Sequence, residues 1–149
     1  MTDWIFEGNP RGHDLHAAVT ASRWQWWSTP RYRDRTAVHD RVWLQIVGPH
    51  LPGIYYLATI TTATYESSEP PAGDSAYGRW RTDIRFDYRI DPPLLRSELL
   101  EDAELGSFRP FRGFQGSTVP LPPDIASTLS DRVAARLRPI EPTGLEPPA

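Results

Sequence analysis

The sequence contains no cysteine and no lysine. Without cysteine, disulfides and thiolate metal sites are excluded, and without lysine no mechanism that needs a catalytic lysine is available. No run of about 20 apolar residues is present, and the N-terminus lacks the basic-then-apolar pattern of a secretory signal. We therefore expect a soluble, cytoplasmic protein that makes no contact with a membrane.

The composition also offers little for metal binding or catalysis. The four histidines, at positions 13, 16, 39 and 50, do not recur with carboxylates at ligand spacing, which predicts no metal site. The net charge is −3, whereas non-specific nucleic-acid binders carry a basic surplus. A Ser-His-Asp order and a glycine-rich phosphate loop are both missing. We expect a non-catalytic protein without a cofactor.

At 149 residues, the chain is long enough for one domain with a normal hydrophobic core. We assign residues 1–138 to that domain. The remaining residues, 139–149, include four prolines. A short terminal segment of this composition is expected to be disordered.

Hydrophobic periodicity indicates the secondary structure. Strands are predicted at residues 4–6, 24–29, 41–47, 54–62 and 83–90, and helices at 14–22, 97–105 and 124–137. The strand 83–90 is expected to end at 91–93, with one core face formed by Ile84, Phe86, Tyr88 and Ile90. Because strands and helices do not alternate as βαβ units, we predict an α+β fold, a small mixed or antiparallel β-barrel of five to six strands with flanking helices.

Two adjacent tryptophans are the most informative stretch of the sequence. Trp26 and Trp27 are followed by Ser28 and Thr29, so bulky rings stand next to small hydroxyl side chains. This pattern is typical of a wall on which a flat ligand stacks while hydroxyls bind its edge. By alternation, Trp27 is the pocket candidate and Trp26 is assigned to the core. The alternative is that Trp27 is itself a core residue.

The order of several short motifs resembles the EVE domain family, within the PUA-like superfamily that also holds YTH and ASCH domains. The resemblance covers about residues 4–137. It rests on Trp4-Ile5-Phe6, Asn9-Pro10, Asp14-Leu15, Trp27, Asp40, Gly53-Ile54, Asp91-Pro92-Pro93-Leu94, Ser97-Glu98-Leu99-Leu100 and Phe114-Gln115-Gly116-Ser117. Trp27-Ser28-Thr29 is also similar to the Trp-Ser-Thr step of YTH domains.

This resemblance implies a PUA-like barrel with an aromatic cage for one base turned out of nucleic acid. EVE domains are associated with modified cytosine in DNA, often in restriction or defence systems, and YTH domains with methylated adenine in RNA. Stacking would supply about 1–3 kcal/mol per base, and hydrogen bonds to the base edge would supply selectivity. We expect a monomeric reader, with DNA favoured over RNA and a nuclease or other defence-system partner. The alternatives are a PUA-like domain that binds a protein or small molecule and has lost base recognition, and a reader of modified RNA.

The candidate site residues follow from the residue types and from the resemblance. The base pocket is assigned to Trp27, Ser28, Thr29, Trp43, Gln45, Trp80, Gln115, Gly116 and Ser117. Phosphate contacts are assigned to Arg31, Arg33, Arg109 and Arg112, because guanidinium forks match phosphate oxygens. For each of these residues the alternative is a core or a solvated surface position.

The sequence departs from the family at several positions near the expected pocket. The glycine that precedes the aspartate in the family is His39 here, and a tryptophan and a serine of the family are Gln45 and Val47. An asparagine-phenylalanine step is replaced by Thr118-Val119. Gln45 offers an amide donor and acceptor where the family has a stacking surface.

Overall fold

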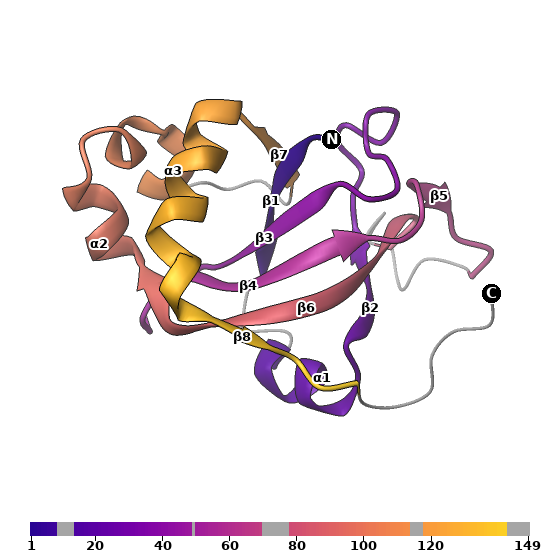
Figure 1. The fold of residues 1–149 in the computed structure, drawn as a ribbon. Helices are drawn as coiled ribbons and strands as arrows, with labels where there is room; N and C mark the ends of the chain where they lie inside the picture. Colours follow the sequence, from indigo (N-terminus) through magenta and orange to yellow (C-terminus); the bar gives the residue numbers. More distant parts are fainter. Residues whose placement is uncertain (9–13, 49, 70–77, 114–117, 143–149) are drawn as a thin grey trace.

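A computed structural model describes residues 1–8, 14–48, 50–69, 78–113 and 118–142. One mixed sheet dominates it (Figure 1). Its main path runs β2 (Trp24–Ser28), β6 (Trp80–Leu95), β4 (Gly53–Ile60), β3 (Arg41–Ile46), β1 (Asp3–Gly8) and β7 (Thr118–Leu121). Two short strands, β5 (Tyr65–Glu66) and β8 (Leu137–Pro139), pair with β6. The β1–β3 pair is parallel and the other pairs are antiparallel, which confirms the expected α+β class.

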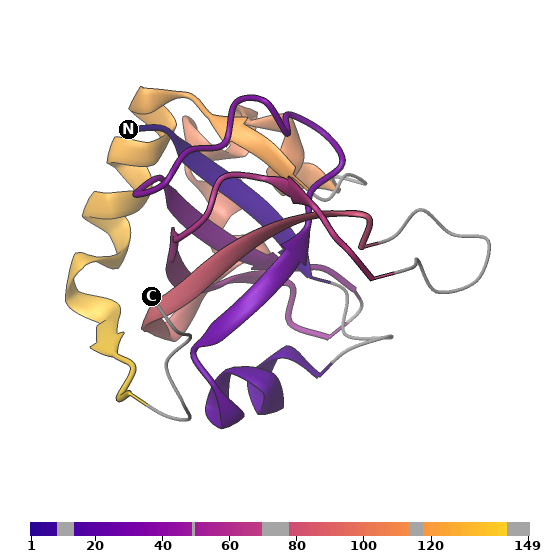
Figure 2. The same cartoon turned by 90° about the vertical axis from the view of Figure 1, so that its right-hand side faces the viewer.

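The helices lie on two sides of this sheet (Figures 1 and 2). The first, α1 (Leu15–Ala21), begins as predicted at Asp14, whose carboxylate accepts from the backbone N–H of Ala17 at 3.1 Å. A second group consists of α2 (Arg96–Glu101), η1 (Leu105–Ser107), η2 (Arg109–Arg112), α3 (Pro123–Val133) and η3 (Ala134–Arg136). No helix in the described ranges is long and apolar enough to cross a membrane.

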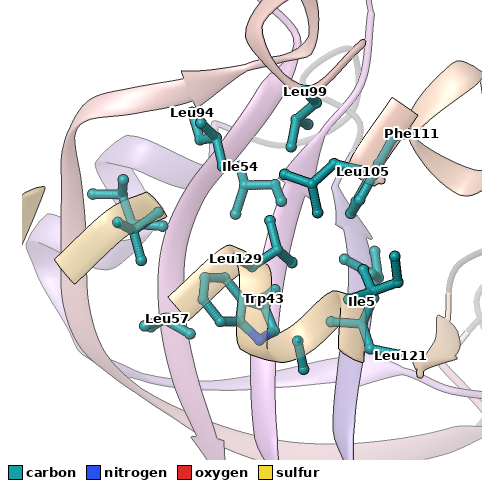
Figure 3. Close-up of a cluster of buried hydrophobic side chains, with 14 residues drawn as sticks. Ile5, Trp43, Ile54, Leu57, Leu94, Leu99, Leu105, Phe111, Leu121 and Leu129 are labelled. Carbon is teal, nitrogen blue, oxygen red and sulfur yellow. The ribbon is translucent and has the colours of Figure 1, made fainter. Parts of the chain in front are cut away.

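Alternation along β3 divides the hydrophobic core into two parts. Val42, Leu44 and Ile46 join an inner core with Trp4 and Phe6. The opposite face of the sheet carries a helix-side core, whose labelled members in Figure 3 include Ile5, Trp43, Leu57, Leu105 and Leu129. Because both faces are covered, β3 is buried from Val42 to Ile46.

The sheet curls around the inner core. β2 and β1 are separated by three strands in the sheet order. Nevertheless, the rings of Trp27 on β2 and Phe6 on β1 are stacked, with centroids 6.4 Å apart and an interplanar angle of 28°. This contact brings the edge strand β2 beside the end of β1. Leu15 and Val19 of α1 add to the same core.

The strand β6 differs from the prediction in two ways. It continues through Pro92 and Pro93 to Leu95 instead of ending there. Its pairing with β4 shifts register between Tyr88 and Phe86, which leaves Asp87 as an extra residue. A bulge of this kind reverses the faces of the residues that follow it. As a result Tyr88, which was expected in the core, is 38% exposed.

The C-terminal segment also differs from the prediction. The last helix ends at Val133, one turn of 3₁₀ helix follows, and Leu137 begins β8. β8 pairs with β6, and the N–H of Ile140 donates to the carbonyl of Asp87 at 2.9 Å. Ile140 packs partly buried against the inner core. The expected boundary at 138/139 therefore falls inside a paired strand, while residues 143–149 lie outside the described part.

Candidate nucleic-acid interface

Trp26 and Trp27 point to opposite sides of β2, as the alternation predicted. Trp27 is half-buried against the inner core, and its Nε1 donates to the backbone carbonyl of Glu7 at 3.3 Å. Trp26 is 39% exposed, so its assignment to the core was wrong. The physical reason is the position of α1, which covers the Trp27 side, where the Gln25 amide donates to the carbonyl of Ala18 at 3.2 Å.

The end of β1 gathers buried polar atoms without hydrogen-bond partners. Among the described residues these include Glu7 Oε2, Gln45 Oε1 and Thr118 Oγ1. Glu7 is paired with Gln45 across the parallel ladder, and Thr118 is paired with Phe6. An unsatisfied buried polar atom costs about 1–3 kcal/mol. Three of them at one end of the sheet mark a place where a polar ligand or water would be bound.

These polar groups lie on both faces of the strand end. Thr118 is on the face of Phe6, whose ring stacks with that of Trp27, while Glu7 and Gln45 are on the opposite face with Ile5. The Gln45 amide nitrogen donates to the carbonyl of Pro110 at 3.2 Å, which leaves its oxygen as a free acceptor. At this strand end, one face of the sheet therefore offers the Trp27 ring, and both faces offer hydrogen-bonding groups.

Glu7 was not recognised as a functional residue from the sequence. Burial raises the pKa of its carboxyl from 4.5 to about 7. Near neutral pH the Glu7 side chain is therefore present in two protonation states. The neutral acid can donate a hydrogen bond, whereas the carboxylate can only accept one. The sequence contains a clue to this residue, because alternation after Asp3 and Ile5 places Glu7 on the buried helix side of β1.

Ser28 and Thr29 were expected to bind a base edge, but the structure gives their hydroxyls internal partners. Ser28 Oγ accepts from the N–H of Gly78 at 3.2 Å. Thr29 is fully buried, and its hydroxyl lies 2.6 Å from that of Thr82. Thr82 continues to Thr64 at 2.7 Å. These side chains therefore tie β2 to β6 rather than face a ligand.

Trp43 also has a structural position. It is completely buried in the helix-side core (Figure 3), and its Nε1 donates to Asp3 Oδ2 at 2.9 Å. Trp27 lies on the other face of the sheet. The structure thus corrects the expectation that Trp43 forms a second pocket wall beside Trp27.

The remaining candidates are distributed over separate elements. Trp80, at the start of β6, is half-buried, and the guanidinium of Arg33 lies 4.1 Å from its ring centroid. Arg31 is exposed in the same loop as Arg33. Arg109 and Arg112 belong to η2, where Arg112 Nε donates to the carbonyl of Gly106 at 2.7 Å. Gln115, Gly116 and Ser117 lie outside the described residues, although they directly precede Thr118 in the chain.

Two of the hollows that the described residues line lie away from Trp27. The larger, of about 620 Å³, lies at the beginning of β1, between Asp3, Arg41 and the start of α3. The smaller, of about 410 Å³, lies between α2 and η2. Within the described ranges, no group of three or more acidic or histidine side chains could hold a metal ion.

No family model and no curated protein matches the sequence. Solved structures do match the fold. The structure of a hypothetical protein from Leishmania major is 18% identical, with a TM-score of 0.71, covering 91% of this chain and 96% of that one. Human THYN1, solved in complex with DNA containing 5-methylcytosine, is 13% identical, with a TM-score of 0.69 and coverages of 89% and 97%.

A third match is the YTH domain of the Zygosaccharomyces rouxii MRB1 protein, solved in complex with N6-methyladenosine RNA. It is 10% identical, with a TM-score of 0.54, covering 89% of this chain and 86% of that one. At such identities the likeness shows the fold. The chain has an α+β PUA-like fold, which it shares with THYN1 and with a YTH domain.

Proposed function

We propose that the protein is a non-catalytic reader of one modified base in nucleic acid, of the EVE type, with modified cytosine in DNA as the favoured ligand. The fold supports this proposal, because it is shared with proteins solved in complex with methylated DNA and methylated RNA. The observation that carries it is the position of Trp27. Its half-buried ring lies beside a strand end that gathers three buried polar atoms without partners.

The proposed mechanism uses both kinds of group. A base turned out of its strand stacks on the Trp27 ring, which is held in place by Phe6 and by the Glu7 carbonyl. The Thr118 hydroxyl, on the same face as Phe6, then binds the pairing edge of the base.

The proposal assigns any cleavage to a partner. We propose that the reader itself catalyses no reaction, acts in the cytoplasm as a monomer and directs a nuclease or other defence-system protein to modified nucleic acid.

The ligand is tested by titration with oligonucleotides of one sequence. The set carries a single 5-methylcytosine, 5-hydroxymethylcytosine, N6-methyladenine or no modification, each as DNA and as RNA. We expect the tightest binding to a modified cytosine in DNA. Equal affinity for all members of the set, or affinity for none, contradicts the proposal. Selective binding of methyladenine RNA would keep the reader function and replace its ligand.

A further inference from the structure

The hollow of about 620 Å³ lies at the beginning of β1, whereas Trp27 contacts the other end of this strand at Glu7. Small-molecule sites usually have volumes of about 300–1,000 Å³, so this hollow is large enough for one small molecule. Figures 1 and 2 both show the N-terminal end of the chain beside the first turn of α3. The proposed reading of a base makes no use of this part of the molecule.

The first cation that lines the hollow, Arg41, is held in a fixed position. Its Nε donates to Asp3 Oδ2 at 2.8 Å, and its Nη2 donates to Ser130 Oγ of α3 at 2.9 Å. The guanidinium carbon lies 5.1 Å from the centroid of the buried Trp43 ring. Among the described residues, Nη1 has no hydrogen-bond partner. Two N–H donors of a positioned guanidinium are therefore left for a ligand.

The second cation that lines the hollow is Arg35, which belongs to the loop between β2 and β3. Its guanidinium carbon lies 5.4 Å from the centroid of the Tyr32 ring, and its backbone N–H donates to the carbonyl of Tyr32 at 2.9 Å. The next residue, Thr36, is buried, and its hydroxyl lies 2.6 Å from that of Thr64. The loop therefore places Arg35 at the hollow before any ligand binds.

The charge of this hollow is positive, although the whole protein has a net charge of −3. Among the described residues that line it, Asp3 supplies the carboxylate, and Arg41 Nη2 lies 2.7 Å from Asp3 Oδ2. Within the described ranges Arg35 has no carboxylate partner, so one positive charge is left over. Guanidinium forks bind the oxygens of phosphate and carboxylate groups.

Much of the remaining wall is apolar. It includes three prolines and an alanine, which are Pro120, Pro122, Pro123 and Ala126. A bare anion would leave this apolar surface in contact with water, whereas a ligand with an apolar body would cover it. The combination of cations and apolar wall therefore fits a ligand that has both an anionic group and an apolar part.

We propose that this hollow binds one small molecule that carries a phosphate or carboxylate group on an apolar body. The anionic group accepts hydrogen bonds from Nη1 of Arg41 and from the guanidinium of Arg35, and the apolar body packs on the prolines. Because Trp27 is at the other end of β1, this site does not depend on the proposed function.

The test is a titration of the isotope-labelled full chain with four probes, followed by two-dimensional NMR. Phenyl phosphate and benzoate each have an anionic group and an apolar ring, inorganic phosphate lacks the ring, and benzyl alcohol lacks the charge. We expect phenyl phosphate or benzoate to bind at least about 10-fold more tightly than either of the other two probes. The amide signals of Asp3, Ala126 and Ser127 should shift with the bound probe.

Variants locate the binding site. Arg35→Gln removes the unpaired cation and should weaken binding of phenyl phosphate about 10-fold. Ser127 lines the hollow, so Ser127→Trp should fill it and abolish binding, whereas Ser127→Ala keeps it open and should retain most of the affinity. Arg138→Gln removes an exposed cation of β8 and should bind as the unaltered protein does. Arg41 is kept, because its loss would leave the buried Asp3 without its ion pair.

Thermal melts of all variants check that the fold is kept. Three results would overturn the inference. The first is binding of none of the four probes. The second is equal binding of inorganic phosphate or benzyl alcohol, which would show that the apolar body or the charge contributes nothing. The third is unchanged binding of phenyl phosphate by folded Arg35→Gln and Ser127→Trp. Tighter binding of benzoate than of phenyl phosphate would support the inference and make the anionic group a carboxylate.

Discussion

At the scale of single residues, Trp27 and Glu7 lie at the same strand end but on opposite faces of the sheet, and their surroundings affect them differently. Trp27 is held by the Phe6 ring and the Glu7 carbonyl. The buried carboxyl oxygen Oε2 of Glu7 has no hydrogen-bond partner among the described residues. A buried carboxyl without a partner favours its neutral form, which makes this residue sensitive to pH.

Glu7→Gln should change how stability depends on pH. The pKa of Glu7 is about 7 in the folded protein and 4.5 without burial, so the folded state binds the extra proton between these values. The free energy of unfolding therefore falls as pH rises from about 4.5 to about 7. In the glutamine variant the free energy of unfolding should not fall with pH through this titration, so the variant should be more stable than the unaltered protein at pH 8. Urea unfolding measured from pH 4 to pH 8 checks this. Parallel curves for the two proteins would contradict a titrating Glu7.

His39 is expected to store backbone strain. Its φ is +76°, the left-handed region that favours glycine, and the resembled family has a glycine here. His39→Gly should relieve this strain, which would raise the free energy of unfolding by about 1 kcal/mol. The greater conformational entropy of glycine in the unfolded chain offsets part of this gain. Val38→Gly, one residue earlier and without positive φ, is the matched control and should not stabilise. A loss of stability in His39→Gly would show that the imidazole makes contacts that outweigh the strain.

At the scale of elements, the sequence predicts strand faces better than it predicts strand surroundings. The alternation in residues 41–47 correctly separated Val42 and Leu44 from Trp43, because side chains of a strand point to alternate faces whatever covers them. The same rule placed Trp26 opposite Trp27. It could not show that α1 covers only one of the two, since that depends on tertiary packing.

Other errors have equally local causes. The bulge at Asp87 reverses the face of Tyr88, and no residue type in β6 predicts the bulge. For Ser28 and Thr29 the sequence leaves open whether the hydroxyls bind a base edge or local groups, because their partners, Gly78 and Thr82, come from distant parts of the chain. Trp27 could therefore be chosen as a candidate from the sequence alone, whereas the polar groups near it come from β1, β3 and β7, whose pairing the sequence does not reveal.

The strand β8 provides a test at this scale. Ile140 follows β8, donates its N–H to Asp87 and packs against the inner core, although it falls in the segment expected to be disordered. Ile140→Ala should lower the free energy of unfolding by about 1–2 kcal/mol, below the range for a fully buried isoleucine because the side chain is only partly buried. The exposed Pro139→Ala should change it by less than about 0.5 kcal/mol. Equal effects of the two substitutions would mean that this segment does not pack on the sheet.

At the scale of the whole molecule, the curl of the sheet determines the proposed function. It brings the edge strand β2 next to the end of β1, so that a tryptophan from one strand stands beside polar groups from others. The opposite side of β2 carries Trp26, which is 39% exposed.

The central claim is that Trp27 recognises the modified base, and a double comparison tests it most directly. The dissociation constants of the unaltered protein and of Trp27→Ala are measured by titration calorimetry for one oligonucleotide with and without 5-methylcytosine. We expect the unaltered protein to prefer the methylated form, and Trp27→Ala to lose about 1–3 kcal/mol of binding free energy on that form while binding the unmodified one almost unchanged. A preference that persists in Trp27→Ala, in a variant whose melting curve shows it folded, would place recognition elsewhere and contradict the account.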